Sequence, residues 1–198
     1  MIISTGMANL AEIHEAVDAA RANGARDIVL LHCTSGYPTP FSDANLRTIP
    51  DLARVFGVAI GLSDHTPGTA SAVASIALGA CVIEKHFTLS RADGGPDAAF
   101  SLEPDELRRL VFDCRAAWEA LGEVNYDLAG SERGNVSFRR SLFVVRPIAA
   151  GEVFTMDNIR SIRPGNGLAP KHLPTLIGRR ARRALERGEP LSWDLIEP

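Results

Sequence analysis

Four short runs of β-forming residues alternate with helical patterns in the first 122 residues of the chain. The runs cover residues 1–5, 28–32, 59–63 and 81–86. This alternation is typical of βαβ units, in which successive strands lie parallel in one sheet. Four strand–helix units make half of an eight-stranded α/β barrel, and they leave two sheet edges without a neighbouring strand. We therefore predict a half barrel that something else must complete.

The helical patterns between the runs have recognisable ends. The first begins at Asn9, which forms a capping-box pattern with Glu12, and Asn23-Gly24 can end it. Three more helices are expected at about residues 45–56, 69–78 and 104–121. Ser101 is the expected N-cap of the last helix, because a serine hydroxyl can accept from the free amides of a first helical turn.

The composition changes after residue 122. A polar stretch precedes Ser141-Leu142-Phe143-Val144-Val145, which opens a β-rich unit punctuated by glycine and proline. We predict one domain over 1–122, a linker over 123–136 and a second domain over 137–198. About sixty residues are too few for a large core, so the second domain should be a compact, strand-rich module.

Charge is distributed unevenly along the chain, whose formal net charge is -3. Residues 1–136 carry 10 basic and 18 acidic side chains, a net of -8, whereas residues 137–198 carry 11 and 6, a net of +5. This contrast predicts two domains that attract one another or a partner subunit, or a basic lobe over an anionic substrate. The arginines are not interleaved with aromatic residues and no nucleic-acid motif is found, so we expect no nucleic-acid partner.

The sequence has the features of a cytoplasmic protein. It is 45% hydrophobic and 23% charged, and no run approaches the ~20 apolar residues of a membrane span. The first residues have neither the basic flank nor the length of a signal peptide. The three cysteines, Cys33, Cys81 and Cys114, include no CxxC pair, and we expect them to be buried reduced thiols.

Two neighbouring strand runs end in histidine, the first at His65 and the next at His86. Parallel strands lie about 4.8 Å apart, and their carboxyl ends open at the mouth where barrel enzymes hold their active sites, so the two imidazoles can converge on one cation. Side-chain alternation puts Ser63 on the face of His65, and Glu84 on the face of His86. From this pattern alone, a metal pair and two structural histidines are about equally expected.

Five short motifs occur in an order that resembles the sialic acid synthase family, which includes N-acetylneuraminate, pseudaminic acid and legionaminic acid synthases. The motifs are His32-Cys33-Thr34-Ser35-Gly36-Tyr37-Pro38-Thr39-Pro40, Gly61-Leu62-Ser63-Asp64-His65-Thr66, Glu84-Lys85-His86-Phe87-Thr88, Gly95-Pro96-Asp97 and Arg163-Pro164-Gly165-Asn166-Gly167. Each is weak alone, but together they cover essentially the whole chain. The resemblance implies strands 5–8 of a TIM-type α/β barrel, followed by a small β-rich antifreeze-like (SAF) domain.

The resemblance also implies a transferase that condenses phosphoenolpyruvate with an N-acetylated amino sugar and releases phosphate. His65 and His86 match the family's two protein ligands for a divalent metal, Mn²⁺ or Mg²⁺, with water and the sugar aldehyde in the other positions. Such a cation would polarise the aldehyde oxygen while phosphoenolpyruvate attacks its carbon. The expected catalytic residues are therefore His65, His86 and Asp97.

Four further positions match substrate contacts of the family. Ser63 and Ser35 match positions that contact phosphoenolpyruvate, where hydroxyl groups can donate to its oxygens. The sialic acid enzymes often carry Asn at the position of Ser35, so the chain departs from the family pattern there. Tyr37 and Asp97 match sugar-contacting positions, although in isolation Asp97 is typical of a turn and Tyr37 of a loop made rigid by its prolines.

The resemblance extends to the second domain and to the choice of sugar. In the family this domain crosses to the other subunit of a homodimer, so Arg163 is expected to contact the sugar's N-acyl group in the partner's active site. Residues 95–104 resemble the pseudaminic acid branch, which uses a 2,4-diacetamido-2,4,6-trideoxy hexose, more than the branch that uses N-acetylmannosamine. The apolar residues 98–100 suit a deoxygenated sugar.

The family's first four strands supply further substrate-binding residues, including lysines, and the sequence does not contain them. We therefore expect a fragment with little or no synthase activity alone. Two alternatives stay open. One is a non-catalytic module that binds a sugar or a partner. The other is a Schiff-base lyase or aldolase with Lys85 as nucleophile, although strand alternation points Lys85 away from the barrel.

Overall fold

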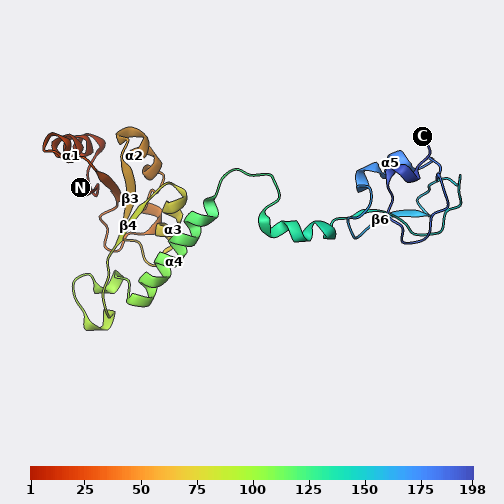
Figure 1. Cartoon of the computed structure of the whole chain (residues 1–198). Coiled ribbons are helices and arrows are strands. Elements are labelled where there is room, and N and C mark those ends of the chain that lie inside the picture. The colour runs from red at the N-terminus through yellow and green to blue at the C-terminus, as the bar shows by residue number, and fades with distance from the viewer. The chain divides into compact units, whose positions relative to one another are not determined.

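The computed structural model describes every residue from Met1 to Pro198. The chain divides into two compact units, Met1–Val124 and Asn125–Pro198 (Figure 1). The division falls inside the stretch 123–136 that was expected to link two domains. A 3-10 helix over Gly130–Phe138 occupies part of that stretch.

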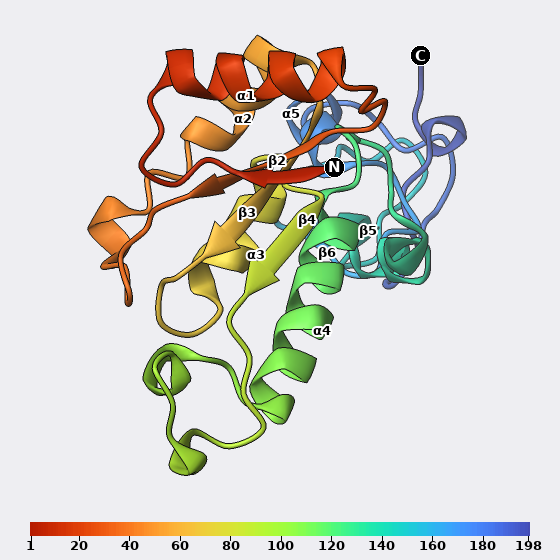
Figure 2. The same ribbon diagram turned by 90° about the vertical axis from the view of Figure 1, so that its left-hand side faces the viewer.

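The first unit is built on a parallel sheet of four strands in the order β1-β2-β3-β4. The strands are β1 (Ile2–Ser4), β2 (Val29–Cys33), β3 (Ala59–Asp64) and β4 (Val82–Lys85). All three pairings are parallel, so the predicted half-barrel sheet is confirmed. Figure 2 shows β3 and β4 side by side, with their carboxyl ends directed toward the loop that follows β4.

Four helices connect or follow the strands: α1 (Leu10–Ala22), α2 (Thr48–Phe56), α3 (Ala70–Ala77) and α4 (Pro104–Leu121). The capping box predicted for the first one is confirmed. Asn9 Oδ1 accepts from the amide of Glu12, and Glu12 Oε2 accepts from the amide of Asn9 at 2.8 Å. These two bonds satisfy amide groups that a helix cannot pair internally.

The predicted N-cap of α4 was wrong. The cap is Glu103, not Ser101, and its amide donates to Glu106 Oε2 at 2.8 Å. Pro104 at the first helical position favours a helix that begins there, because its ring fixes a helical φ and it has no amide to satisfy. Ser101 is instead buried in the preceding turn, where its hydroxyl donates to the carbonyl of Asp97 at 2.7 Å.

The core of the first unit lies between the helices and one face of the sheet. Alternate strand residues, including Leu30, Ile60 and Leu62, pack with Val17 of α1 and Ile49 of α2. Burying each such side chain contributes about 1.5–3 kcal/mol. Because successive strand residues point to opposite faces, the intervening residues lie on the other face, which the helices do not cover.

A glycine is required where β3 crosses this uncovered face. A Cβ atom at Gly61 would lie 2.3 Å from the carbonyl oxygen of Val82 and 2.5 Å from Leu31 Cδ2. Real Cβ atoms do not come this close to backbone, so no side chain fits there without moving β4. Gly61 therefore allows the two strands that carry the histidines to approach one another.

The cysteines are free, as expected, but the prediction that they are buried was wrong. Cys81 is exposed, while Cys33 and Cys114 are half-buried. Cys81 and Cys114 both line a groove of about 790 Å³ beside β4 and α4. The groove lies beside the edge of the sheet, because β4 is an edge strand and no strand pairs with its outer side in this chain. Burial nevertheless raises the pKa of the Cys114 thiol.

The second unit has its own core and little regular structure. Its strands β5 (Ser141–Val144) and β6 (Ile159–Ile162) pair antiparallel, and four isolated bridges join other segments to the same unit. It also contains one short helix, α5 (Leu173–Leu176). The core is made of apolar side chains from all of these segments, among them Leu142, Phe154 and Leu191. In neither unit is any helix long and apolar enough to cross a membrane.

Candidate active site

The two histidines that end neighbouring strand runs lie together in the structure. His65 directly follows β3 and His86 directly follows β4, and their ring centroids are 5.1 Å apart in an edge-on arrangement. The parallel register of β3 with β4 puts Ser63 beside Glu84, two residues before each histidine. Since side chains two apart share a face, both imidazoles belong to the uncovered face of the sheet.

Hydrogen bonding fixes the tautomer of His65. Its Nδ1 lies 2.9 Å from the carbonyl oxygen of Thr34. A carbonyl oxygen only accepts, so Nδ1 carries the proton and the neutral ring keeps its lone pair on Nε2. His65 is 6% exposed, and Cys33 Sγ lies 3.9 Å from the same Nδ1. The result is a rigid imidazole with one nitrogen available as a ligand.

His86 is held by the loop of residues 88–101, here called the 88–101 loop. Its Nδ1 lies 3.4 Å from Asp97 Oδ2, and the His86 carbonyl accepts from the amide of Leu102 at 2.8 Å. A carboxylate beside Nδ1 favours the tautomer with its proton there, which leaves Nε2 as the free nitrogen of a neutral His86 ring. The His86 side chain is 24% exposed, so it remains accessible to a ligand from solvent.

The donor set suits a divalent cation that keeps open positions. Two imidazole nitrogens with free lone pairs can bind a divalent cation, and a carboxylate behind one ring is a frequent support for such a ligand. No group of three or more His, Cys, Asp or Glu side chains in this chain is arranged to hold a metal. The two histidines would thus supply two ligands, with the remaining ones coming from water or substrate.

Ser63 and Glu84 form a hydrogen-bonded pair on the face below the histidines. The Ser63 hydroxyl donates to Glu84 Oε2 at 2.7 Å. Strand alternation predicts Glu84 on this face, although no role in the site was predicted for it. The signal was present in the alternation, because Glu84 lies two residues before His86 on the same strand. Glu84 adds an exposed carboxylate to the site.

Ser35 lies at the end of β2 next to the first turn of the chain. Its Oγ is 3.9 Å from Cys33 Sγ, and a Cβ atom on Gly6 would come within 2.2 Å of that Oγ. The glycine therefore leaves the space that the Ser35 hydroxyl occupies. Ser35 therefore lies near His65, because Cys33 Sγ is 3.9 Å from both Ser35 Oγ and His65 Nδ1.

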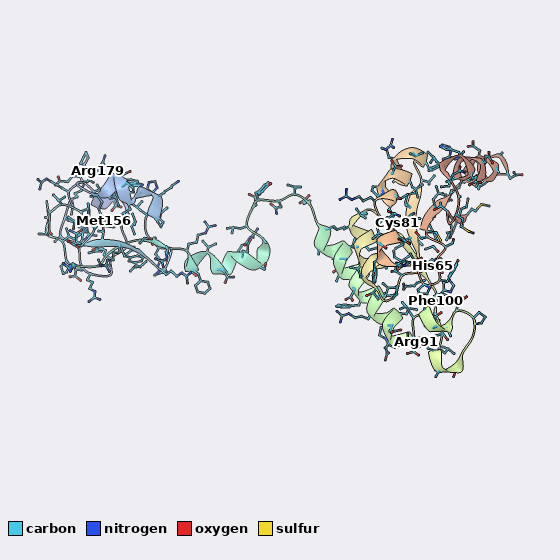
Figure 3. The ribbon with its side chains drawn as sticks, turned by 180° about the vertical axis from the view of Figure 1, so that it is seen from behind. His65, Cys81, Arg91, Phe100, Met156 and Arg179 are labelled. Atoms are coloured by element: carbon cyan, nitrogen blue, oxygen red, sulfur yellow. The ribbon has the colours of Figure 1, made fainter.

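Two aromatic rings flank the histidines. The Tyr37 ring lies 4.4 Å from the His65 ring and 5.8 Å from the His86 ring. Phe100, from the 88–101 loop, lies 5.1 Å from His86 and 5.7 Å from Tyr37. Figure 3 shows Phe100 beyond the strand end that carries His65, whereas Cys81 lies toward the other end of the sheet. The apolar character of residues 98–100 is evident in the sequence, but the contact of Phe100 with a histidine was not predicted.

Lys85 cannot act as a Schiff-base nucleophile in this arrangement. Its ammonium donates to Asp64 Oδ2 at 2.9 Å and to the Thr66 carbonyl at 2.6 Å. The Lys85 and Asp64 side chains are 2% and 1% exposed, and alternation places them on the helix-covered face. A substrate carbonyl has no access to this amine, so the lyase or aldolase alternative loses its nucleophile.

Arg163 belongs to the second unit, where it is exposed. The loop that follows it is anchored through Ser141, whose hydroxyl donates to the Pro164 carbonyl at 2.7 Å and accepts from the amide of Gly167 at 2.9 Å. The structure thus assembles His65, His86, Asp97, Tyr37, Ser63 and Ser35 in the first unit. The role of Arg163 stays a prediction.

Comparison with known proteins supports the sequence motifs. Residues 1–126 match the NeuB family, and residues 139–197 match the SAF domain. The N,N'-diacetyllegionaminic acid synthase of Campylobacter jejuni is 42% identical over 192 residues, which are 96% of this chain and 58% of that protein. A pseudaminic acid synthase of Campylobacter jejuni is 40% identical over 190 residues, which are 96% of this chain and 55% of that protein.

A solved structure extends the comparison to the fold. The spore coat polysaccharide biosynthesis protein SpsE of Bacillus subtilis has a TM-score of 0.58 and 36% identity, covering 100% of this chain and 61% of that one. For the two synthases of Campylobacter jejuni named above, the chain spans 58% and 55% of the length of the relative. The half-barrel sheet, the SAF domain and the motifs agree on one assignment: the chain belongs to the NeuB family.

Proposed function

We propose that this chain forms the cation- and sugar-binding part of a nonulosonic acid synthase, which condenses phosphoenolpyruvate with an N-acetylated amino sugar and releases phosphate. The observation that carries the proposal is the pair of imidazoles 5.1 Å apart at adjacent strand ends. The names of the relatives, legionaminic and pseudaminic acid synthases, support the class of reaction. The activity itself is proposed for a protein of the relatives' full length.

The residues of the site have separate proposed roles. His65 and His86 present free Nε2 atoms to a divalent cation, Mn²⁺ or Mg²⁺. When bound, such a cation supplies Lewis-acid polarisation of a substrate oxygen. Asp97 orients the His86 ring through Nδ1 and leaves its second oxygen for a sugar hydroxyl. Ser63 and Ser35 offer hydroxyl donors to the carboxylate or phosphate of phosphoenolpyruvate.

The site also has features that suit a deoxygenated sugar, as in the pseudaminic acid branch. Phe100 and Tyr37 form an apolar wall beside the histidines, and Ala98 in the same loop is buried. A wall of this kind favours a substrate that carries a methyl group where another has a hydroxyl. We expect the Mn²⁺-loaded protein to bind a 2,4-diacetamido-2,4,6-trideoxy hexose more tightly than N-acetylmannosamine. Equal affinities in a calorimetric comparison would contradict this preference.

Metal binding tests the proposal and separates it from its alternative. A non-catalytic sugar- or partner-binding module has no need for a cation between two histidines. Isothermal titration of the chain with Mn²⁺ should give one site per chain, lost in both His65→Gln and His86→Gln. His14→Gln is the control, because the His14 ring lies 4.5 Å from the Phe56 ring, outside the site. Unchanged binding in all three variants would favour the module.

Synthase activity is expected to need residues beyond this chain. In an assay of phosphate release from phosphoenolpyruvate, the 198-residue chain alone should show little or no turnover.

We further propose that the protein forms a homodimer, in which Arg163 of one subunit contacts the N-acyl group of the sugar bound in the active site of the other subunit. Light scattering of a full-length relative carrying this segment should give a dimer mass, and a monomer with full activity would contradict this arrangement.

A further inference from the structure

The 88–101 loop begins and ends at the same place. Phe87 and Leu102 form a parallel bridge, in which the amide of Thr88 donates to the Leu102 carbonyl at 2.9 Å and the amide of Leu102 donates to the His86 carbonyl at 2.8 Å. This loop carries Asp97 and Phe100, which both contact the His86 ring. The closure of the loop therefore decides whether these two groups stay near His86.

The middle of the loop has few bonds of its own. Gly94 and Gly95 adopt φ values of 75° and 125°, and both are exposed. Asp97 begins a single turn of 3-10 helix, and its carbonyl accepts from the hydroxyl and the amide of Ser101. A second 3-10 turn, Arg91–Asp93, is closed by the amides of Asp93 and Gly94, which donate to the carbonyls of Ser90 and Arg91. Outside these two local turns, contacts at the ends of the loop hold it in place.

Arg91 makes those contacts. Its backbone amide donates to Glu103 Oε1 at 2.8 Å, and its guanidinium donates to the Ser101 carbonyl at 3.1 Å. The same guanidinium forms a two-point ion pair with Glu106, with Nη2 to Oε1 at 3.1 Å as one of the two contacts. The hydrogen bond from Arg91 lowers the pKa of Glu106, so the carboxylate stays charged at neutral pH.

These partners lie on a firmly packed element. Glu103 is the N-cap of α4 and Glu106 lies in its first turn, and this helix packs against α3 through Leu110 and Ala72. Arg91 thus connects the start of the loop to its end and to a helix that does not depend on the loop. Only a planar guanidinium with several donors can serve a carbonyl and two carboxylates at once, so lysine is not an equivalent replacement.

We propose that Arg91 is a positioning residue, a latch that closes the 88–101 loop and so keeps Asp97 and Phe100 against His86. The inference rests on the proposed function of that site. It assigns no contact between Arg91 and substrate, since the guanidinium is occupied by Ser101, Glu103 and Glu106. Figure 3 shows Arg91 in the region of Phe100 and away from Cys81.

Hydrogen–deuterium exchange of the chain tests the latch directly. In Arg91→Met we expect the amides of Thr88, Ser101 and Leu102 to exchange about tenfold faster than in the wild type, because loop opening becomes easier. Arg91→Lys should show most of the same increase. Arg109→Met is the matched control, since Arg109 pairs with Asp113 on the exposed side of α4. Exchange in Arg91→Met no faster than in the control would overturn the proposal.

A second measurement separates positioning from a general loss of stability. The dissociation constant for Mn²⁺ should rise about tenfold in Asp97→Asn, as expected for the carboxylate support of a histidine ligand. Arg91→Met should raise the constant by a smaller factor, and the double variant should equal Asp97→Asn. Additive factors in the double variant would contradict a latch that acts through Asp97.

The two proposals fail in different ways. A wild-type chain that binds no Mn²⁺ would contradict the proposed function, while the exchange experiment would still decide whether Arg91 closes the loop. If Arg91→Met fails to fold, Glu106→Gln replaces it, because the amide keeps the shape of the side chain and removes the charge. Faster exchange at Ser101 in Glu106→Gln supports the latch, and wild-type exchange there contradicts it.

Discussion

Ser63 and Glu84 face each other across β3 and β4, and the Ser63 hydroxyl donates to Glu84 Oε2 at 2.7 Å. The pair lies two residues before the two histidines on the uncovered face of the sheet. A carboxylate beside a hydroxyl orients the hydroxyl hydrogen toward itself and leaves the Ser63 lone pairs free to accept. For Ser63 to donate to an anionic substrate, that hydrogen must turn away from Glu84.

Removing the Ser63 hydroxyl should weaken the binding of phosphoenolpyruvate, because the protein then loses a donor that can turn from Glu84 toward an anionic oxygen. We expect Ser63→Ala to raise the dissociation constant of phosphoenolpyruvate by about tenfold in the Mn²⁺-loaded protein, as for the loss of one hydrogen bond to a charged group. Titration followed by phosphorus NMR measures this constant. Ser42→Ala, on an exposed 3-10 turn, should leave it unchanged, and equal constants for both variants would remove Ser63 from the substrate site.

Gly61 is expected to be essential for the geometry of the site. In Gly61→Ala the new Cβ would meet the Val82 carbonyl at 2.3 Å, so β4 must move away from β3. We predict that the free energy of unfolding falls by about 3 kcal/mol, measured by urea denaturation. Gly130→Ala is the control, since nothing lies within 4 Å of a Cβ there. Equal stability of the two variants would show that the strands can separate without penalty.

The buried pair of Lys85 and Asp64 should be a structural element only. Lys85→Met leaves the Asp64 carboxylate buried without its cation, which should lower the free energy of unfolding by about 3 kcal/mol. Adding Asp64→Asn to this variant should recover part of the loss, because no charge is then left unpaired. Trp118 fluorescence can follow unfolding of this unit. A trapped Lys85 adduct after borohydride treatment with pyruvate would contradict the structural role.

The histidine pair could be predicted from the sequence, but the loop around it could not. Strand alternation and parallel pairing are local rules, and they are enough to place His65 and His86 on one face of the sheet. Phe100 and Arg91 were missed because their contacts, Phe100 with His86 and Arg91 with Glu106, join residues more than ten positions apart in the sequence. No periodic pattern in the sequence records such contacts.

Two errors have the same kind of cause. Ser101 has the residue type of an N-cap, yet the helix begins after Glu103 because Pro104 and Glu106 together favour that start. Cys81 lies in an apolar run that predicts burial, yet it is exposed because β4 has no neighbour on its outer side in this chain. Local preference fixed the element in each case, and tertiary context decided the exposure and the boundary.

Acid should weaken the second unit through Glu189. The hydrogen bond from Arg183 lowers the pKa of Glu189 below its ordinary value of 4.5. A lowered folded-state pKa means that this ion pair stabilises the fold above about pH 4.5, and the contribution is lost as the pH falls through the folded-state value. Thermal unfolding followed at Trp193 should therefore show a smaller loss between pH 5 and pH 3 in Glu189→Gln than in the wild type. Glu197→Gln is the control. Because Glu197 takes no part in the Arg183–Glu189 ion pair, this variant should behave like the wild type.

Pulsed electron paramagnetic resonance of bound Mn²⁺ tests the central claim most directly, because it counts the nitrogen atoms attached to the metal. The wild-type chain should show two imidazole nitrogens, and His65→Gln and His86→Gln should each show one. A spectrum without nitrogen coupling, or one that neither substitution changes, would contradict a cation held between these two histidines.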